Sequence, residues 1–158
     1  MLITRAVFAE TVARLRNCFD VETNLDDTEW PPHELARRLH DKAGVLGTAA
    51  ERIDAPLLDA NPQLRAVCLM TAGYNRVDIG HCTARGVLVT NAPDVQTETV
   101  ADLGFALMMA ATRRMSEAER FLRSGQWTKW RYDLLAGSDI HAATLGILSM
   151  GQIGRAHV

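Results

Sequence analysis

The chain of 158 residues lacks the long basic and long apolar tracts that mark two broad classes of protein. Its basic residues are scattered and the formal net charge is −2, so we expect no nucleic-acid partner. The longest apolar stretch, residues 100–111, contains Asp102 and is shorter than a bilayer-spanning helix requires. We therefore expect no membrane partner.

Cysteine is scarce and shows no pattern of pairing. Cys18, Cys68 and Cys82 have no C-x-x-C spacing, and an odd number does not fit a disulfide framework. The N-terminus becomes polar too soon for a secretory signal peptide. These absences predict a cytoplasmic protein in a reducing compartment. Cys68 lies in an apolar run, where we expect a buried thiol.

The histidines show no metal-ligand spacing, and no Ser-His-Asp or Cys-His arrangement stands out, so we expect no metal site. His33, His40 and His81 are expected at the surface or partly buried on helices. His157 lies near the C-terminus, where we expect disorder.

Residues 1–96 alternate short apolar runs with helical segments, which predicts an α/β fold with a parallel sheet and right-handed crossovers. The expected strands are residues 2–4, 20–24, 44–47, 65–70 and 87–90. The expected helices are residues 10–19, 33–41, 55–60 and 77–85.

Residues 97–143 have a different character. Thr97 is a plausible N-cap for a helix that is apolar almost all round over residues 100–111, which is typical of a helix buried on several sides. A capping-box pattern at Ser116 indicates that a helix breaks and restarts there. Residues 126–142, which carry two tryptophans without clear periodicity, are expected to form an arm or long loop.

The most informative local pattern is at residues 143–154, where an apolar run, a glycine turn and a helix start follow one another. Residues 144–148 suit a buried parallel strand. Gly151 would let a pyrophosphate approach the backbone, and Gly154 would let the helix pack closely. Ser149 replaces the first glycine of the G-x-G-x-x-G pattern, and its Cβ would strain the turn. The alternative is a plain strand-turn-helix connection.

Several ordered motifs together resemble the D-isomer-specific 2-hydroxyacid dehydrogenases, in particular the glyoxylate/hydroxypyruvate reductases. The motifs are residues 71–78, 85–87, 91–95, 97–102, 125–130, 137–141 and the final glycine turn. The resemblance implies three parts: a flavodoxin-like substrate domain at 1–96 without its C-terminal helix, a linking helix and dimerisation arm at 97–143, and the start of a Rossmann NAD(P)-binding domain at 144–158.

The resemblance also implies site residues. Backbone amides at Ala72 and Gly73 would hold the substrate carboxylate, although the same turn could be purely structural. Trp130 in the arm would approach the substrate site of a neighbouring subunit in a homodimer, or serve only as a packing anchor.

The remaining implied residues belong to the cofactor, NAD or NADP. Val100 would lie beside the nicotinamide, and could also be an ordinary core valine. The phosphate-binding turn would comprise Gly151, Gln152, Ile153 and Gly154.

The resemblance implies reduction of a small 2-oxoacid, such as glyoxylate or hydroxypyruvate, to a D-2-hydroxy acid. The arginine, glutamate and histidine that catalyse this reaction in the family have no counterpart in the sequence. Neither does the residue that distinguishes NAD from NADP. We therefore expect this chain to be inactive alone. Two alternatives stay open: a non-catalytic oligomerising or binding module, and a fragment without a function of its own.

Overall fold

The computed structural model describes residues 1–156, so the expectation for His157 lies outside the described residues. The chain divides into two compact units, Met1–Pro93 and Asp94–Val158. Each unit is described by itself below. Within residues 1–156, no helix is both long and apolar enough to cross a membrane.

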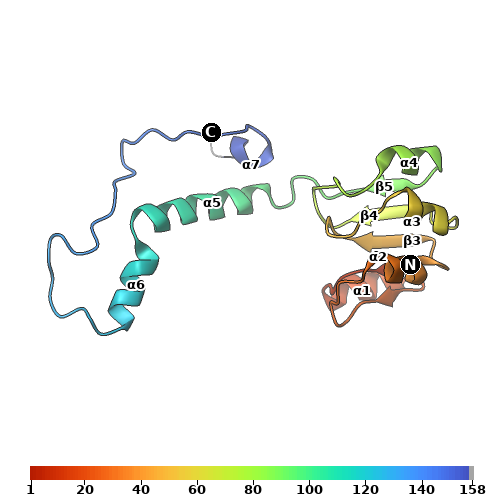
Figure 1. The fold of residues 1–158 in the computed structure, drawn as a ribbon, viewed down its shortest axis with the longest axis horizontal. Helices are drawn as coiled ribbons and strands as arrows, with labels where there is room; N and C mark the ends of the chain where they lie inside the picture. The colour runs from red at the N-terminus through yellow and green to blue at the C-terminus, as the bar shows by residue number, and fades with distance from the viewer. Residues whose placement is uncertain (157–158) are drawn as a thin grey trace. The chain divides into compact units, whose positions relative to one another are not determined.

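The first unit contains a five-stranded parallel sheet with the strand order β2-β1-β3-β4-β5 (Figure 1). The strands are β1 (Leu2–Ile3), β2 (Glu22–Thr23), β3 (Gly44–Gly47), β4 (Ala66–Leu69) and β5 (Leu88–Thr90). All five expected strands are present, shortened by up to three residues. The predicted α/β fold class with a flavodoxin-like parallel sheet is confirmed.

Four helices connect these strands: α1 (Ala9–Arg16), α2 (Pro32–Leu39), α3 (Ala55–Ala60) and α4 (Ile79–Ala84). Helix α3 contacts both α2 and α4, so these three helices share one face of the sheet. The step from β1 to β2 runs across the sheet in the direction opposite to the steps from β3 to β4 and from β4 to β5. A right-handed crossover therefore places α1 on the other face.

The hydrophobic core lies between the sheet and the face that carries α2, α3 and α4. Strands β3 and β4 both alternate partly buried and buried residues, with Val45, Val67 and Leu69 pointing into this core. Helix α1 has no buried residue, so the face that it covers is more open. Cys68 points to that face and is only partly buried, which corrects the expectation of a core thiol; Cys82 on α4 is the buried one.

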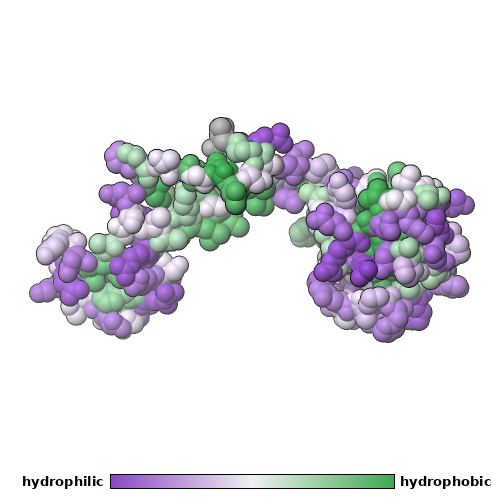
Figure 2. All heavy atoms as spheres, turned by 45° about the horizontal axis from the view of Figure 1, so that its top comes forward, coloured by the Kyte–Doolittle hydropathy of each residue, from purple (hydrophilic) through white to green (hydrophobic). Residues whose placement is uncertain are grey.

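The second unit begins with α5 (Thr97–Thr112), followed by α6 (Met115–Arg123) and the short helix α7 (Gln152–Arg155), which packs against α5. The apolar pattern of residues 100–111 is typical of a helix buried on several sides, but on α5 of this chain only Ala101 is buried. Hydrophobic side chains gather along this helix at the surface (Figure 2).

Two expected helix caps are also wrong. Gln96, not Thr97, is the N-cap of α5, and it makes no side-chain capping bond. Helix α6 starts after Arg114, whose backbone is left-handed with φ +52°, so Ser116 lies inside the helix and caps nothing. The break at Arg114 is therefore made by the backbone, and the predicted capping box is not used.

Residues 144–148 do not form the expected strand. A β-strand needs a neighbouring strand for its hydrogen bonds, and no described residue of the second unit is in a strand. Residues 126–142 form an arm without helix or strand, as expected. Its Ser138 amide donates to the Thr112 carbonyl at 3.0 Å, and this bond fastens the arm to the end of α5.

Candidate functional site

The turn after β4 contains Ala72 and Gly73, the two residues expected to hold a substrate carboxylate. Strand β4 ends at Leu69, and the Met70 amide donates to the Gly47 carbonyl at 2.8 Å, so the turn begins at the carboxyl edge of the sheet. Ligands of open α/β sheets bind outside this edge. Ala72 is partly buried and Gly73 is exposed, which leaves the turn accessible.

Three consecutive amide groups of this turn are free to bind a ligand. Within residues 1–156, the N–H groups of Ala72, Gly73 and Tyr74 donate to no acceptor. Successive backbone N–H groups in a turn form an anion-binding concavity. Gly73 adds no side chain, and a Cβ built there would lie 3.9 Å from that of Ala49. A carboxylate can therefore approach these amides closely.

The carbonyl groups of the same turn are all engaged. The Thr71 carbonyl accepts from the Ala92 amide at 3.1 Å, and the Ala72 carbonyl accepts from Asn91 Nδ2 at 2.8 Å. The Gly73 carbonyl accepts from the Thr71 hydroxyl at 3.1 Å. The turn is thus held through its carbonyl groups, while the N–H groups of Ala72, Gly73 and Tyr74 remain unpaired within the described residues.

The loop after β3 is fastened beside this turn. Glu51 Oε2 accepts from the Thr48 amide at 2.7 Å and from the Thr48 hydroxyl at 2.8 Å, which closes the loop on itself. Arg76 Nη1 donates to the Ala50 carbonyl at 2.9 Å, and the Ile53 amide donates to the Arg76 carbonyl at 2.9 Å. These bonds join the loops that follow β3 and β4.

An open hollow of about 590 Å³ lies at the carboxyl edge of β1, β3 and β4, within the range of small-molecule pockets. Its lining residues come from helix α1 and from the loops after β1, β2, β3 and β4: Arg5, Ala6, Val7, Phe8, Thr11, Asp27, Glu29, Thr48, Ala50 and Met70. Met70 directly precedes the candidate carboxylate turn in the chain, but Ala72 and Gly73 themselves do not line the hollow.

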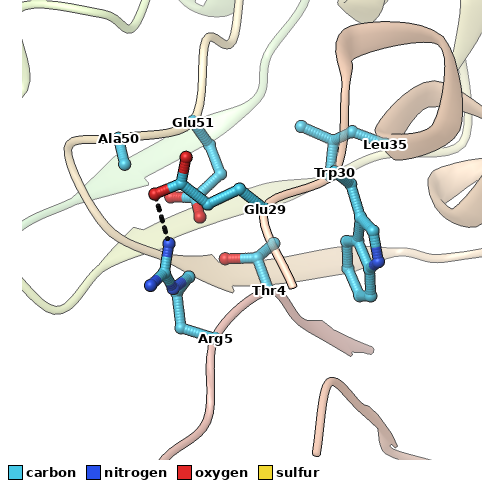
Figure 3. Close-up of a pocket in the computed structure, with 7 residues that line it drawn as sticks. All are labelled: Thr4, Arg5, Glu29, Trp30, Leu35, Ala50 and Glu51. Atoms are coloured by element: carbon cyan, nitrogen blue, oxygen red, sulfur yellow. Dashed lines mark hydrogen bonds and ion pairs between the residues drawn. The ribbon is translucent and has the colours of Figure 1, made fainter. Parts of the chain in front are cut away.

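A smaller cavity of about 70 Å³ nearby is a weaker candidate (Figure 3). The Arg5 guanidinium that lines it donates to both oxygens of Asp27 at 2.9 Å and to Glu29 at 3.1 Å. The bonds from Arg5 lower the pKa of the Asp27 carboxyl. This guanidinium is already paired with two carboxylates, and the cavity is far smaller than the roughly 300 Å³ of small ligand pockets. We therefore assign the Arg5 guanidinium a structural role, because it joins the loops after β1 and β2.

The glycine turn at residues 149–154 leads into helix α7 as its sequence predicts, although no strand directly precedes it. Ser149 has φ +80°, so the residue that replaces the first glycine does adopt a strained backbone. A Cβ at Gly154 would collide with the Ser149 carbonyl, which explains the glycine there. Gly151 has no such neighbour and no positive φ. Its missing side chain therefore leaves open space at the start of α7, which fits close approach by a phosphate.

Gln152 and Val100 lie on the two helices that pack together in the second unit. Gln152 Nε2 donates to Asp94 Oδ1 at 2.7 Å, which ties α7 to the residues preceding α5. Val100 is in the first turns of α5 and is 39 % exposed. Ile153 on α7 is exposed as well. Val100 and the glycine turn thus belong to the second unit, whereas Ala72 and Gly73 belong to the first.

Trp130 lies in the arm and is 76 % exposed. Tyr132, two residues later, is 86 % exposed. Neither ring packs into a core, so the simple anchoring role that the sequence left open for Trp130 is not seen within this chain.

Sequence reasoning missed Thr71 and Asn91, which hold the carboxylate turn. Both stand inside motifs of the family resemblance, but no role was assigned to them. The available signal was a hydroxyl or amide side chain within two residues of the end of each of two neighbouring strands, β4 and β5. A metal site is a separate question: within residues 1–156, no group of three or more His, Cys, Asp or Glu side chains is arranged to hold a metal ion.

The catalytic domain of the D-isomer specific 2-hydroxyacid dehydrogenases matches residues 1–144. Glyoxylate reductases from Thermococcus onnurineus and Aeropyrum pernix are 38% and 39% identical, over 99% and 98% of this chain and 48% and 47% of their own length. The chain therefore spans about half the length of the curated relatives it matches.

Solved structures agree with these sequence relatives. A protein from Thermus thermophilus shares 35% identity with a TM-score of 0.90, over 98% of this chain and 50% of that one. An NADPH-dependent glyoxylate/hydroxypyruvate reductase from Sinorhizobium meliloti, solved with citrate, shares 30% identity with a TM-score of 0.77, over 98% of this chain and 48% of that one. By sequence and fold, the chain belongs to the D-isomer specific 2-hydroxyacid dehydrogenase family.

Proposed function

We propose that this chain carries the substrate-carboxylate turn and the first phosphate-binding turn of an NAD(P)-dependent oxidoreductase. The substrate would be a small 2-oxoacid such as glyoxylate or hydroxypyruvate, interconverted with its D-2-hydroxy acid. The glyoxylate reductases among the relatives support this substrate class. The free cysteines Cys18, Cys68 and Cys82 support a reducing, cytoplasmic setting.

The observation that carries the proposal is the set of unpaired amides at Ala72, Gly73 and Tyr74. A 2-oxoacid presents a planar carboxylate with two acceptor oxygens, and adjacent N–H groups can donate to both. Charged acceptors make hydrogen bonds roughly twice as strong as neutral ones. The turn therefore selects for a carboxylate over a neutral carbonyl compound.

The glycine turn at the start of α7 would hold the pyrophosphate of NAD or NADP. The open space at Gly151 and the helix start, which no side chain caps, support this assignment. When bound, the cofactor supplies the hydride. Val100 on α5 would contact the nicotinamide, because its side chain is exposed on the helix that packs against α7.

We further propose that this chain by itself binds substrate but does not reduce it. The reaction needs a group that exchanges a proton with the reacting oxygen. His81, the histidine of the first unit nearest in sequence to the turn, is held by Asp59 at 2.8 Å and is thereby committed to joining α4 to α3.

Titration calorimetry with oxamate, a non-reducible analogue of a 2-oxoacid, tests the binding part of the proposal. Oxamide, which has the same shape without the carboxylate, is the matched control. We expect saturable heats with oxamate and none with oxamide. Equal behaviour of the two compounds would contradict carboxylate recognition, and steady oxidation of NADPH with glyoxylate would overturn the claim that the chain alone is inactive.

A second candidate function is non-catalytic association of two copies through the arm and α5. The exposure of Trp130 in the arm and of Leu103, Leu107 and Met109 on α5 favours it. Contiguous apolar surface of this kind is typical of an interface. Multi-angle light scattering should then give the mass of a dimer, and Trp130→Ala should shift it toward monomer. A monomeric, folded chain would contradict this candidate.

A further inference from the structure

We propose that Asn91 is a positioning residue that orients the free amides of the carboxylate turn. This inference rests on the proposed function, because it concerns how the proposed substrate turn is built. Asn91 belongs to the segment after β5, and its Nδ2 donates to the Ala72 carbonyl at 2.8 Å.

Peptide geometry links that bond to the amide on the opposite side. The carbonyl of Ala72 and the N–H of Gly73 belong to one peptide unit, and no peptide bond among the described residues is cis. In a trans peptide the C=O and N–H bonds point in opposite directions. When Asn91 holds the Ala72 carbonyl, the Gly73 N–H must therefore point away from Asn91.

The same argument applies to the peptide units on either side. The Ala92 amide holds the Thr71 carbonyl at 3.1 Å, which turns the Ala72 N–H away from Ala92. The Thr71 hydroxyl holds the Gly73 carbonyl at 3.1 Å, which fixes the direction of the Tyr74 N–H. Three consecutive peptide units are thus each held by the carbonyl, with the three N–H groups left unpaired.

The sheet brings Asn91 to this place. Strands β4 and β5 are parallel neighbours, and Cys68 pairs in register with Thr90. Asn91 therefore leaves β5 alongside the end of β4, at the point where the turn begins. The bond to the Ala72 carbonyl depends on a side-chain N–H donor, which asparagine has and aspartate lacks. Asn91→Asp is accordingly the closest isosteric test.

The experiment combines two readouts on the full chain labelled with ¹⁵N. Residual dipolar couplings of the backbone amides report the direction of each N–H bond without any ligand, and the shift of the Gly73 amide during an oxamate titration gives a Kd. For Asn91→Ala and Asn91→Asp we expect a changed Gly73 coupling. We also expect binding weaker by about threefold to tenfold, the equivalent of one modest hydrogen bond.

Gln63→Ala is the matched control, because Gln63 Nε2 donates to the Leu39 carbonyl at 2.6 Å before β4 begins, at the other edge of the sheet. It should change neither readout. If the Asn91 variants do not fold, Thr71→Val tests the same inference. Valine keeps the side-chain shape but cannot donate to the Gly73 carbonyl, so the Tyr74 coupling should change.

The inference would be overturned if folded Asn91 variants kept both the Gly73 coupling and the Kd of the wild type. If the Asn91 variants do not fold, an unchanged Tyr74 coupling in Thr71→Val would overturn it. Couplings that change in a chain whose wild type binds no oxamate would instead sustain the positioning role and overturn the proposed function.

Discussion

Gly137 and Gly154 are both placed where another stretch of backbone leaves no room for a side chain. A Cβ at Gly137 would collide with the Thr112 carbonyl at the end of α5, and a Cβ at Gly154 would collide with the Ser149 carbonyl. Neither glycine has a positive φ, so close approach explains both. In the arm, this approach allows the Ser138 amide to bond to Thr112.

Gly137→Ala should release the arm from the end of α5. Because the added methyl group cannot fit, we expect the docked arm to be destabilised by about 1–3 kcal/mol. The measurement is hydrogen exchange at the Ser138 amide, which should become faster. Gly146→Ala is the control, since no atom lies within 4 Å of a Cβ built there. Equal exchange in wild type and Gly137→Ala would refute the proposed close contact.

Ser149 differs from these two glycines, because its backbone has a positive φ although the residue carries a Cβ. Ser149→Gly should remove a backbone cost of about 1–2 kcal/mol and stabilise the turn that starts α7. Exchange of the Arg155 amide, which donates to the Gly151 carbonyl at 3.1 Å, should slow. Ser149→Ala keeps the Cβ and should show no such gain; a gain in both variants would mean that the hydroxyl, not the backbone, is the cause.

At the scale of elements, helix α2 is held by an ion-pair cluster on its outer side. Glu34 accepts two bonds from Arg37, at 2.7 and 2.8 Å, and one from Arg38 at 2.7 Å. Arg38 also reaches Glu22 on the edge strand β2 at 2.9 Å, and its guanidinium lies over the Trp30 ring. The cluster therefore connects α2 to the edge of the sheet.

This cluster predicts a pH dependence of stability. The bonds from Arg37 and then Arg38 lower the pKa of Glu34 from 4.5 to about 2. A carboxyl with a lowered folded-state pKa stabilises the protein above its ordinary value, and that contribution is lost as the pH falls toward the folded value. Glu34→Gln should thus lower the free energy of unfolding at pH 7, and its difference from wild type should shrink between about pH 4.5 and 2.

Urea unfolding across that pH range measures the effect. Glu10→Gln is the control, because Glu10 also lies in the first turn of a helix, α1, but makes no ion pair within the described residues. A Glu34→Gln difference that stays constant with pH would contradict the assignment.

At the scale of the whole molecule, buried apolar side chains are concentrated in the first unit. Ala101 is the single buried hydrophobic residue of the second unit within the described range. Local stability follows buried apolar contact, so the two units should differ in it. We expect amides of β3 and β4 to be the slowest to exchange and those of α5 to exchange faster. Equal protection of α5 and the sheet would indicate that a partner covers α5 in solution.

The sequence predicted the parts of the fold whose causes are local. Residues 44–47 and 55–60 have the expected bounds, since glycines limit β3 and Asp54 accepts from the Leu57 amide at the start of α3. The strained Ser149 also followed from its position in a glycine pattern. The local pattern alone predicts neither the exposure of α5 nor the absence of a strand at 144–148, because each element depends on a partner surface. The bond from Asn91 to Ala72 depends on strand order, which the sequence does not state.

The carboxylate turn is the central claim, and a ¹⁵N–¹H correlation spectrum of the full chain during an oxamate titration tests it most directly. The amides of Ala72, Gly73 and Tyr74 should shift together with one saturating curve, because their free N–H groups would donate to the same carboxylate. Shifts centred on Arg5 or elsewhere, with these three amides unmoved at saturation, would contradict the account.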